Sequence, residues 1–382
     1  MIAAMPVRAT KRGAARTRLR GEYDVLVCGA SFGGLAVARE LAGSGARTLI
    51  VDRYEIGERA TSACGIPTQW MHALGTADAI QQTFGEILLH TSYGSVRWKL
   101  PWTFSTFDYR KMCALLRQQG EDARFETATV HGRTGEVVHT DRGDLRAELI
   151  VDALGWRRIL GTRATVQPPH ARLSRALEVH PRGPGDEMEI WVKRSYVPAG
   201  YGWSFPAGGE LRVGVGSYDP HYHVKEPTVR LAADTDVAAV RFQGNWIPHK
   251  IRPATEAGVF FVGDSAGQCL PTSAEGIRTA LYFGLACGRE LRAVVEGRRR
   301  KRDALTRYHL FSASHAWRFD LLFNVQQLYP RLPPPVLHRT LQVMARQPLI
   351  DQIFNWYLAI APPEFARAPR AAAEPQPVEL AA

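Results

Sequence analysis

The stretch that decides the fold is YDVLVCGASFGG, which occupies residues 23–34. Its first six residues form the apolar run of a buried strand, and the glycines that follow mark a tight turn. Residues 35–41 continue as a helix of small and apolar side chains, and residues 47–52 form a second apolar run. Strand, glycine-rich turn, helix and strand in this order predict a βαβ unit.

The turn carries the pattern Gly29-x-Ser31-x-x-Gly34, a variant of the dinucleotide-binding fingerprint. Gly29 allows the tight turn, Ser31 replaces the glycine that normally faces the pyrophosphate, and Gly34 allows the helix to pack closely on the strand. Asp52 ends the second apolar run, where a carboxylate binds ribose hydroxyl groups, so we predict a dinucleotide site. The other residues assigned to this end of the site are Gly33, Arg53 and Val130.

Later segments indicate which dinucleotide binds. An apolar run ends at Gly-Asp264 and precedes a long helix predicted over residues 274–296, whose start can face the ribityl and phosphate groups of a flavin. Upstream, residues 149–155 read as another strand that ends in Asp152-x-x-Gly155. Three separate segments of the chain, residues 29–34, 149–155 and 260–267, are thus predicted to contact the cofactor. This favours FAD over NAD. The residues predicted to contact FAD from these later segments are Asp264, Gly267, Gly276 and Ile277.

These segments resemble the flavoprotein superfamily built around the para-hydroxybenzoate hydroxylase fold. The resemblance implies an α/β protein with a discontinuous, Rossmann-like FAD-binding domain, an inserted antiparallel β-sheet substrate domain and a C-terminal helical region. We assign residues 22–85, 107–164 and 241–300 to the first, 86–106 and 165–240 to the second, and 301–370 to the third. Helices are expected over residues 68–82 and 107–119, and strands near residues 86–90 and 95–100.

The most distinctive segment is PAGYGWSFP, residues 198–206, followed seven residues later by Gly214-Val-Gly216. Alternation along a strand places Tyr201, Trp203 and Phe205 on one face, where they form an apolar wall with two polar groups. The segment resembles the P-x-x-Y-x-W-x-F-P-x(7)-G-x-G motif of the geranylgeranyl reductase family at every fixed position. In that family the motif lines a lipid cavity beside the flavin. The residues that the resemblance assigns to substrate binding are Tyr201, Trp203, Phe205 and Pro206.

The same resemblance implies the chemistry. Reduced FAD would saturate an isolated C=C bond of a prenyl chain, with a hydride going to one carbon and a proton to the other. Cys64, in a Cys-Gly pair that the family places near the flavin, and Tyr201 are candidate proton donors, as is a water molecule, while Trp203 belongs to the cavity. The family often has an arginine at the helix start that touches FAD, which suggests Arg110. The electron donor is expected to be NADPH or a reduced electron carrier.

Other functions fit the same fold. An FAD-dependent monooxygenase would use the cavity for hydroxylation or epoxidation, and a non-redox cyclase resembling lycopene cyclase would isomerise its substrate. A halogenase needs a lysine near the flavin, but no lysine occurs between Lys11 and Lys99. His221-x-His223 lacks a third ligand at suitable spacing, so no metal site is predicted.

The charge distribution excludes one class of partner. The chain of 382 residues carries a formal charge of +11, but residues 1–20 hold six basic residues and no acid, and residues 298–302 hold five more. The remainder is neutral, so we expect no nucleic-acid partner. The basic segments and an aromatic-rich C-terminal region suggest peripheral contact with an anionic membrane surface. The five cysteines fit a reducing cytoplasm. We expect residues 1–21 and 371–382 to be disordered, and the oligomeric state stays open.

Overall fold

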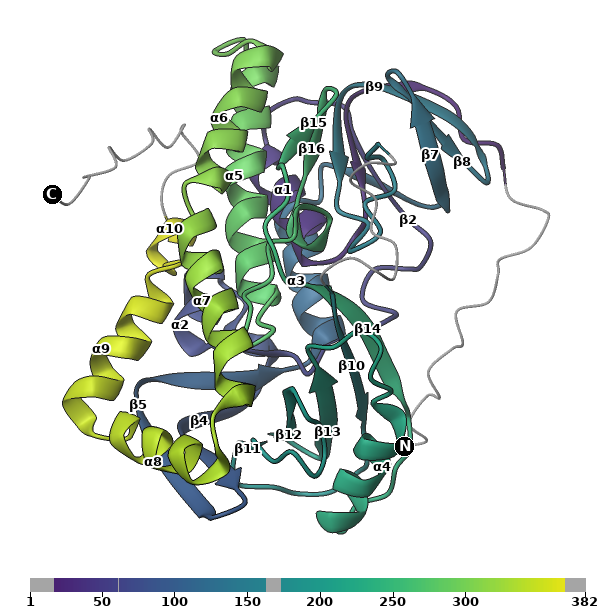
Figure 1. The fold of residues 1–382 in the computed structure, drawn as a ribbon. Helices are drawn as coiled ribbons and strands as arrows, with labels where there is room; N and C mark the ends of the chain where they lie inside the picture. The colour runs from purple at the N-terminus through teal and green to yellow at the C-terminus, as the bar shows by residue number, and fades with distance from the viewer. Residues whose placement is uncertain (1–16, 61, 163–172, 368–382) are drawn as a thin grey trace, which may run out of the picture.

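The computed structural model describes residues 17–60, 62–162 and 173–367, which fold around two β-sheets (Figure 1). The first sheet has the strand order β15-β16-β9-β1-β2-β6, and the hairpin of β7 and β8 extends from β9. β1 pairs in parallel with both β2 and β9, which confirms the predicted βαβ unit. Its strands are β1 (Glu22–Cys28), β2 (Thr48–Asp52), β6 (Arg124–Thr127), β7 (Val130–Thr134), β8 (Val137–Thr140), β9 (Gly143–Asp152), β15 (Thr255–Glu256) and β16 (Val259–Phe261).

Two glycines of the fingerprint close the turn between β1 and helix α1 (Phe32–Leu41). Gly29 has a φ of +111°, and a Cβ atom there would lie 2.2 Å from the carbonyl oxygen of Ala153. A Cβ atom on Gly34 would lie 1.9 Å from the carbonyl oxygen of Gly29. Only glycine fits either position, so the helix start is held close to the strand ends.

The second sheet has the order β14-β10-β13-β12-β11-β4-β5-β3 and lies beyond the carboxyl edge of the first sheet (Figure 1). It is antiparallel except where β11 pairs with β4. β3 and β14 belong to this sheet, although residues 65–67 and 243–248 fall in ranges assigned above to the FAD-binding domain. The domain division itself stays a prediction. The strands are β3 (Gly65–Pro67), β4 (Ile80–Thr91), β5 (Gly94–Phe107), β10 (Leu173–Val179), β11 (Glu189–Trp191), β12 (Gly200–Ala207), β13 (Glu210–Ser217) and β14 (Gln243–Pro248).

The helix expected over residues 68–82 is wrong in its length. Helix α2 spans only Thr68–Leu74, because Gly75 follows in the left-handed conformation with a φ of +68° and ends it. After a short 3₁₀ turn the chain enters β4, and the strands expected near residues 86–90 and 95–100 extend over the whole of β4 and β5. Helix α3 (Tyr109–Gln119) is confirmed and begins after Asp108, whose side chain accepts a hydrogen bond from the Lys111 amide.

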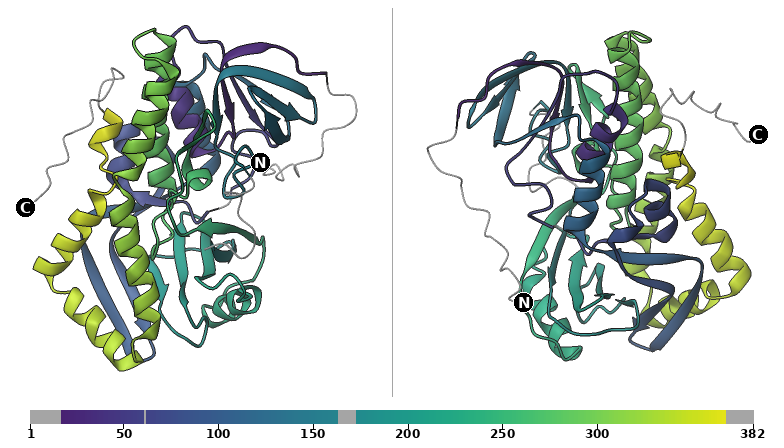
Figure 2. Two further views of the ribbon diagram at one scale, coloured as in Figure 1. Left: turned by 45° about the horizontal axis from the view of Figure 1, so that its top comes forward. Right: turned by 180° about the vertical axis from the view of Figure 1, so that it is seen from behind.

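The C-terminal helical region is confirmed. Helix α5 (Ile277–Val295) packs on α1, and the later helices run down one side of the molecule to the second sheet, where α8 and α9 lie against β5 (Figure 2). The remaining helices are α4 (Lys225–Asp234), α6 (Lys301–Ala313), α7 (Ala316–Leu328), α8 (Pro334–Met344), α9 (Gln347–Leu358) and α10 (Glu364–Arg367). Among the helices of the described residues, none is long and apolar enough to cross a membrane.

The basic segments differ in what the fold does with them. Residues 1–16 and 371–382 lie outside the described residues. Residues 17–21 were expected to belong to the disordered arm, yet Leu19 is buried and its amide donates to the Arg142 carbonyl at 2.8 Å. In the second basic stretch, Arg298 and Arg299 form ion pairs with Glu296 and Glu290. Part of the positive charge of this stretch is therefore neutralised by ion pairs within the protein.

Candidate active site: a cavity between the two sheets

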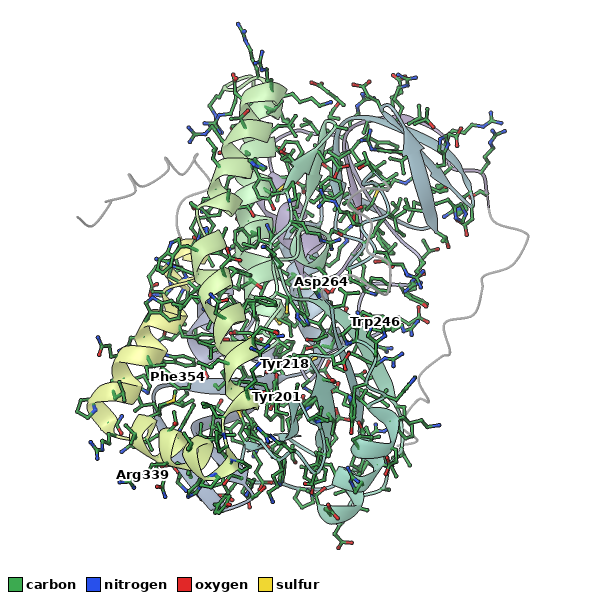
Figure 3. The ribbon with its side chains drawn as sticks, viewed as in Figure 1. Tyr201, Tyr218, Trp246, Asp264, Arg339 and Phe354 are labelled. Carbon is green, nitrogen blue, oxygen red and sulfur yellow. The ribbon has the colours of Figure 1, made fainter. Side chains whose placement is uncertain are left out.

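A cavity of about 2250 Å³ lies between the carboxyl edge of the first sheet, the second sheet and helices α7–α9. Figure 3 labels Asp264, Tyr201 and Tyr218, three of the residues around it. Ordinary small-molecule pockets measure roughly 300–1,000 Å³, so this cavity has room for a large cofactor and a second molecule. The predicted site residues that line it are Ser31, Gly33, Asp52, Arg53, Val130, Tyr201, Trp203, Phe205, Asp264, Gly276 and Ile277.

The dinucleotide end of the cavity is built by the first βαβ unit. The Asp52 carboxylate accepts hydrogen bonds from the amides of Ala30 at 2.8 Å and Tyr54 at 3.1 Å, which hold it at the end of β2. Burial raises the pKa of Asp52. The Ser31 hydroxyl lies 3.2 Å from the Tyr109 hydroxyl of α3, so two helix starts meet where the pyrophosphate is expected.

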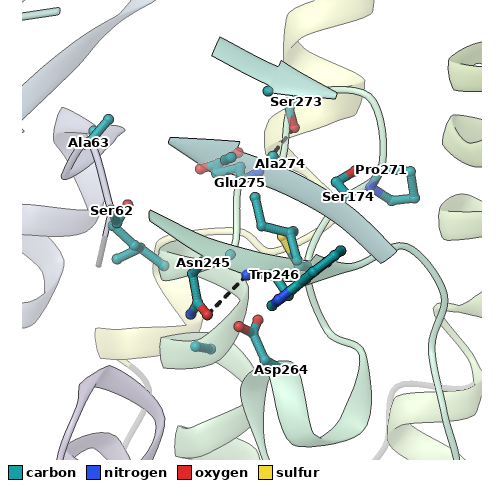
Figure 4. Close-up of a pocket in the computed structure, with 18 of the residues that line it drawn as sticks. Ser62, Ala63, Ser174, Asn245, Trp246, Asp264, Pro271, Ser273, Ala274 and Glu275 are labelled. Carbon is teal, nitrogen blue, oxygen red and sulfur yellow. Dashed lines mark hydrogen bonds between the residues drawn. The ribbon is translucent and has the colours of Figure 1, made fainter. Parts of the chain in front are cut away.

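Asp264 forms the middle of the cavity wall. It lies in the 3₁₀ turn Gly263–Ala266, directly after β16, and Gly267 ends the turn with a φ of +64°. Figure 4 shows Asp264 beside Asn245 and Trp246 of the second sheet. Burial raises the pKa of Asp264 to about 6, and the positive charge of Arg252 offsets only part of this effect. A carboxylate that is desolvated in this way is suited to accept hydrogen bonds from ligand hydroxyl groups.

The motif around Asp152 suggested contact with the cofactor, but its carboxylate is hydrogen-bonded within the protein. Its carboxylate accepts hydrogen bonds from the amides of Leu154 at 3.0 Å and Leu160 at 2.8 Å. The Ser265 hydroxyl donates a third bond at 2.6 Å. Asp152 thus ties the end of β9 to the turn that carries Asp264, while the loop that follows it, residues 153–157, lines the cavity.

The aromatic wall is placed as the alternation predicts, because Tyr201, Trp203 and Phe205 of β12 all line the cavity. The ring centroids of Tyr201 and Trp203 are 5.9 Å apart. The Tyr201 hydroxyl donates to the Ser273 carbonyl at 2.5 Å, and burial raises the pKa of this phenol. Pro206 is buried and packs toward Gly185, outside the cavity wall.

Three strained residues surround the same space. Cys64, Thr272 and Ala274 have φ values of +54°, +67° and +55°, which are unfavourable for residues with a Cβ atom. The Thr272 carbonyl accepts a hydrogen bond of 2.5 Å from Tyr218, and the Ser273 carbonyl accepts that of Tyr201. Strain of this kind is found where function requires a particular backbone path. Here it shapes the loop that leads to Gly276 and Ile277.

Cys64 and Arg110 are not among the residues that line the cavity. Ser62, Ala63 and Gly65 line the cavity, whereas the Cys64 thiol is buried beside them and donates to the Ser62 carbonyl at 3.1 Å. Burial raises the pKa of Cys64 to about 12, so the thiol keeps its proton. Arg110 is exposed on α3, and its neighbour Tyr109 lines the cavity instead. The roles of both residues stay predictions.

Several cavity residues carry no motif and were missed. Tyr109 had a signal, because it lies beside the arginine that the family pattern suggested. Glu178 of β10 had none, since one glutamate in an alternating strand is indistinguishable from a surface residue. Its burial follows only from the pairing of β10 between β13 and β14. The missed residues include Tyr109, Glu178, Tyr218 and Gln243, all of which line the cavity.

Known proteins resemble this chain in sequence. No family profile matches the chain. Digeranylgeranylglycerophospholipid reductase of Methanocella arvoryzae is 24% identical over 339 residues, which cover 76% of this chain and 82% of that protein. The chloroplastic geranylgeranyl diphosphate reductase of Nicotiana tabacum is 33% identical over 115 residues, 28% of this chain and 24% of that one. The chain is a relative of the geranylgeranyl reductases.

Solved structures agree on the fold. A geranylgeranyl bacteriochlorophyll reductase-like protein of Thermoplasma acidophilum superposes with a TM-score of 0.76 at 19% identity, covering 91% of this chain and 98% of that chain. The flavin-dependent brominase Bmp2 superposes with a TM-score of 0.62 at 14% identity, covering 88% and 99%. The fold is thus that of FAD-dependent oxidoreductases, and the reductase relatives support an enzyme.

The residues of the cavity fit FAD. The tight turn at Gly29 and the close packing at Gly34 bring the start of α1 to the cavity, where Ser31 and Gly33 line it. Asp52 and Asp264 supply carboxylates that could accept hydrogen bonds from the hydroxyl groups of FAD. The same cavity is lined by Tyr201 and Trp203.

Proposed function

We propose that this protein is an FAD-dependent reductase that saturates C=C bonds of a prenyl or similar apolar chain. The observation that carries the proposal is the continuity of the cavity, which joins the dinucleotide cradle to an aromatic and aliphatic chamber. The wall of that chamber comes from β12 and from α7–α9, with Leu322, Leu337, Leu341 and Phe354 among its side chains.

The chain's own residues have separable tasks in this reaction. Bound FAD, once reduced, supplies a hydride. Gly29, Ser31 and Asp52 would hold its dinucleotide part, and Asp264 would accept from its hydroxyl groups. Trp203 and Phe205 would hold the alkene in a dry environment, where it cannot move away from the reacting position. The remaining requirement is a proton for the second alkene carbon.

The electron donor is part of the proposal. We infer that NADPH or a reduced electron carrier delivers electrons to the flavin. Following flavin reduction anaerobically with each donor would test this. NADPH is supported if it reduces the bound flavin within the turnover time, and a carrier is supported if NADPH alone does not.

The deciding experiment uses the whole protein with FAD. The flavin is reduced anaerobically with dithionite, a prenyl lipid extract is added, and products are analysed by mass spectrometry. A gain of 2 mass units for each reduced bond supports the reductase, because two hydrogen atoms are added. A gain of 16 that requires oxygen supports the rival monooxygenase, and a product of unchanged mass supports a cyclase.

We also propose peripheral contact with an anionic lipid surface. Leu321 and Leu328 of α7 are 45% and 59% exposed and also line the cavity, so this helix joins the apolar interior to the outside. Trp317 of the same helix is 56% exposed. Co-sedimentation with liposomes should increase with anionic lipid and decrease with salt. Binding that responds to neither would contradict the contact.

A further inference from the structure

Three titratable side chains, Glu178, His180 and Glu210, form a connected chain in the second sheet, outside every sequence motif. Glu178 of β10 is 3% exposed and lines the cavity. One of its carboxylate oxygens lies 3.0 Å from Nε2 of His180, and Nδ1 of His180 lies 3.6 Å from the carboxylate of Glu210 on β13. An imidazole is therefore held between two carboxylates, of which only Glu178 lines the cavity.

The outer end of this chain is the imidazole of His180, which contacts both carboxylates. Burial lowers the pKa of His180, but the hydrogen bonds to Glu178 and Glu210 outweigh this effect and raise it overall. Burial raises the pKa of Glu210, while His180, Arg212 and Arg241 lower it to about 2. Among the described residues, Glu178 and Glu210 contact the imidazole itself, whereas Arg212 and Arg241 pair with Glu210. The side chain of His180 is 12% exposed, so it reaches water.

The inner end meets the aromatic wall and the Cys64 loop. The second carboxylate oxygen of Glu178 accepts a hydrogen bond of 3.2 Å from the Trp203 indole, and Gln243 donates to the first. Gln243 also donates to the Ser62 carbonyl at 3.2 Å, while Arg212 donates to the Ala63 carbonyl at 2.7 Å. The carboxylate is thus fixed between the two segments that the family resemblance assigns to the substrate cavity.

We propose that Glu178 delivers the proton of the reduction and that His180 returns a proton to it from water. This inference rests on the proposed reductase function. Bound and reduced FAD would supply a hydride, with its electron pair, to one alkene carbon. The other carbon forms its new C–H bond with the alkene π electrons as the O–H bond of the Glu178 acid breaks. His180 then protonates the carboxylate and takes a proton from water.

Glu178 suits this task better than the donors that the sequence suggested. Burial raises the pKa values of Tyr201 and Cys64, so both hold their protons more tightly than an ordinary phenol or thiol. The Tyr201 hydroxyl proton is also engaged by the Ser273 carbonyl. Glu178, in contrast, lies in the cavity wall and is hydrogen-bonded to His180, whose side chain is partly exposed to solvent.

The test compares Glu178→Gln and His180→Gln with a matched control, Glu189→Gln. Glu189 of β11 pairs with His90 at 2.8 Å in the same sheet, but neither residue is among those that line the cavity. Each variant, loaded with FAD and reduced by dithionite, is mixed anaerobically with the prenyl substrate that the wild type reduces. Flavin reoxidation is followed by absorbance, and NMR of labelled histidine measures the pKa of His180 in the protein without substrate.

We expect Glu178→Gln to slow reoxidation by roughly 100-fold or more, as loss of a general acid does, and Glu189→Gln to change it by less than about 3-fold. His180→Gln should slow it roughly 10-fold and remove the pH-dependent limb that matches the NMR pKa of His180. That pKa should decrease in Glu178→Gln, because one of its carboxylate partners is lost. If Glu178→Gln fails to fold, Glu178→Ala with added formate takes its place, and formate should restore the rate.

The outcomes separate two failures. A wild-type protein that reduces no prenyl substrate overturns the reductase function and this inference together. A wild-type protein that reduces the substrate while Glu178→Gln stays within about 3-fold of it overturns only the role of Glu178. A His180 pKa that does not change in Glu178→Gln overturns the connection between the two residues, whatever the rates are.

Discussion

Two acids line the same cavity from opposite sides, the half-buried Asp264 and the buried Glu178, and their surroundings differ. Asp264 lies on the side of the first sheet. Burial raises its pKa to about 6, although the positive charge of Arg252 acts in the opposite direction. Glu178, on the second-sheet side, is surrounded by hydrogen-bond partners from His180, Trp203 and Gln243. The first acid is left for a ligand to satisfy, whereas the second is already part of an internal network.

The two surroundings lead to two different expectations. A carboxylate whose burial is poorly compensated gains most when ligand hydroxyl groups bind it, so we expect substitution of Asp264 to act mainly on the binding of FAD. Glu178 is already hydrogen-bonded to a partly exposed imidazole, so we expect its substitution to act on the reaction and not on binding.

The largest effect is expected at Asp264. Asp264→Ala should weaken FAD binding by roughly 10²–10³-fold, because charge-assisted hydrogen bonds contribute about 1.5–3 kcal/mol each. Trp203→Ala should leave most of the flavin bound and reduce turnover per flavin instead. Flavin-to-protein ratios after dialysis measure this. If Trp203→Ala lost its flavin but kept normal turnover per bound flavin, the aromatic wall would bind the cofactor and not the substrate.

Removing the same charge should stabilise the protein without FAD. A folded-state pKa of about 6 for Asp264, above the ordinary 3.8, means that ionisation costs stability as the pH rises through this interval. Asp264→Asn should therefore be more stable than the wild type by about 3 kcal/mol at pH 8, and the difference should vanish below pH 4. Urea denaturation at several pH values checks the sign. A less stable Asp264→Asn would show that the charge is compensated.

Glu210 should show the opposite sign. Its pKa of about 2 lies below the ordinary 4.5, so its contribution to stability is present above pH 4.5 and is lost as the pH falls toward 2. Glu210→Gln should lose about 2 kcal/mol at pH 7, and the gap from wild type should narrow as the pH falls. The same urea series measures it. A gap that is independent of pH would mean that packing, and not charge, holds this end of the network.

The smallest effect is expected at Arg110. Because this residue is exposed on α3 while Tyr109 lines the cavity, Arg110→Ala should change FAD affinity by less than about 3-fold. Flavin titration followed by fluorescence measures the affinity, with Asp264→Ala as the reference for a large loss. A decrease in FAD affinity of 10-fold or more would instead indicate that Arg110 contacts FAD.

Sequence and structure agree best where function depends on neighbours along the chain. The β1–α1 turn, Asp52 and the alternation of Tyr201, Trp203 and Phe205 are local patterns, and the structure places all of them as the patterns indicate. Agreement is poorer where a pattern has two readings. Residues 68–82 have helix-like spacing, but the left-handed Gly75 stops the helix and the following residues join the second sheet.

The nucleotide-binding fold, the expectation of FAD and the aromatic wall all follow from local patterns, because turn geometry and strand alternation act over a few residues. The polar groups that face the cavity could be identified only from the folded chain. The Asp152 carboxylate accepts hydrogen bonds from the amides of Leu154 and Leu160. The Glu178 carboxylate is instead hydrogen-bonded to the side chains of His180, Trp203 and Gln243. Strand pairing between distant segments sets the burial and the hydrogen-bond partners of each acid, and no local sequence pattern encodes this pairing.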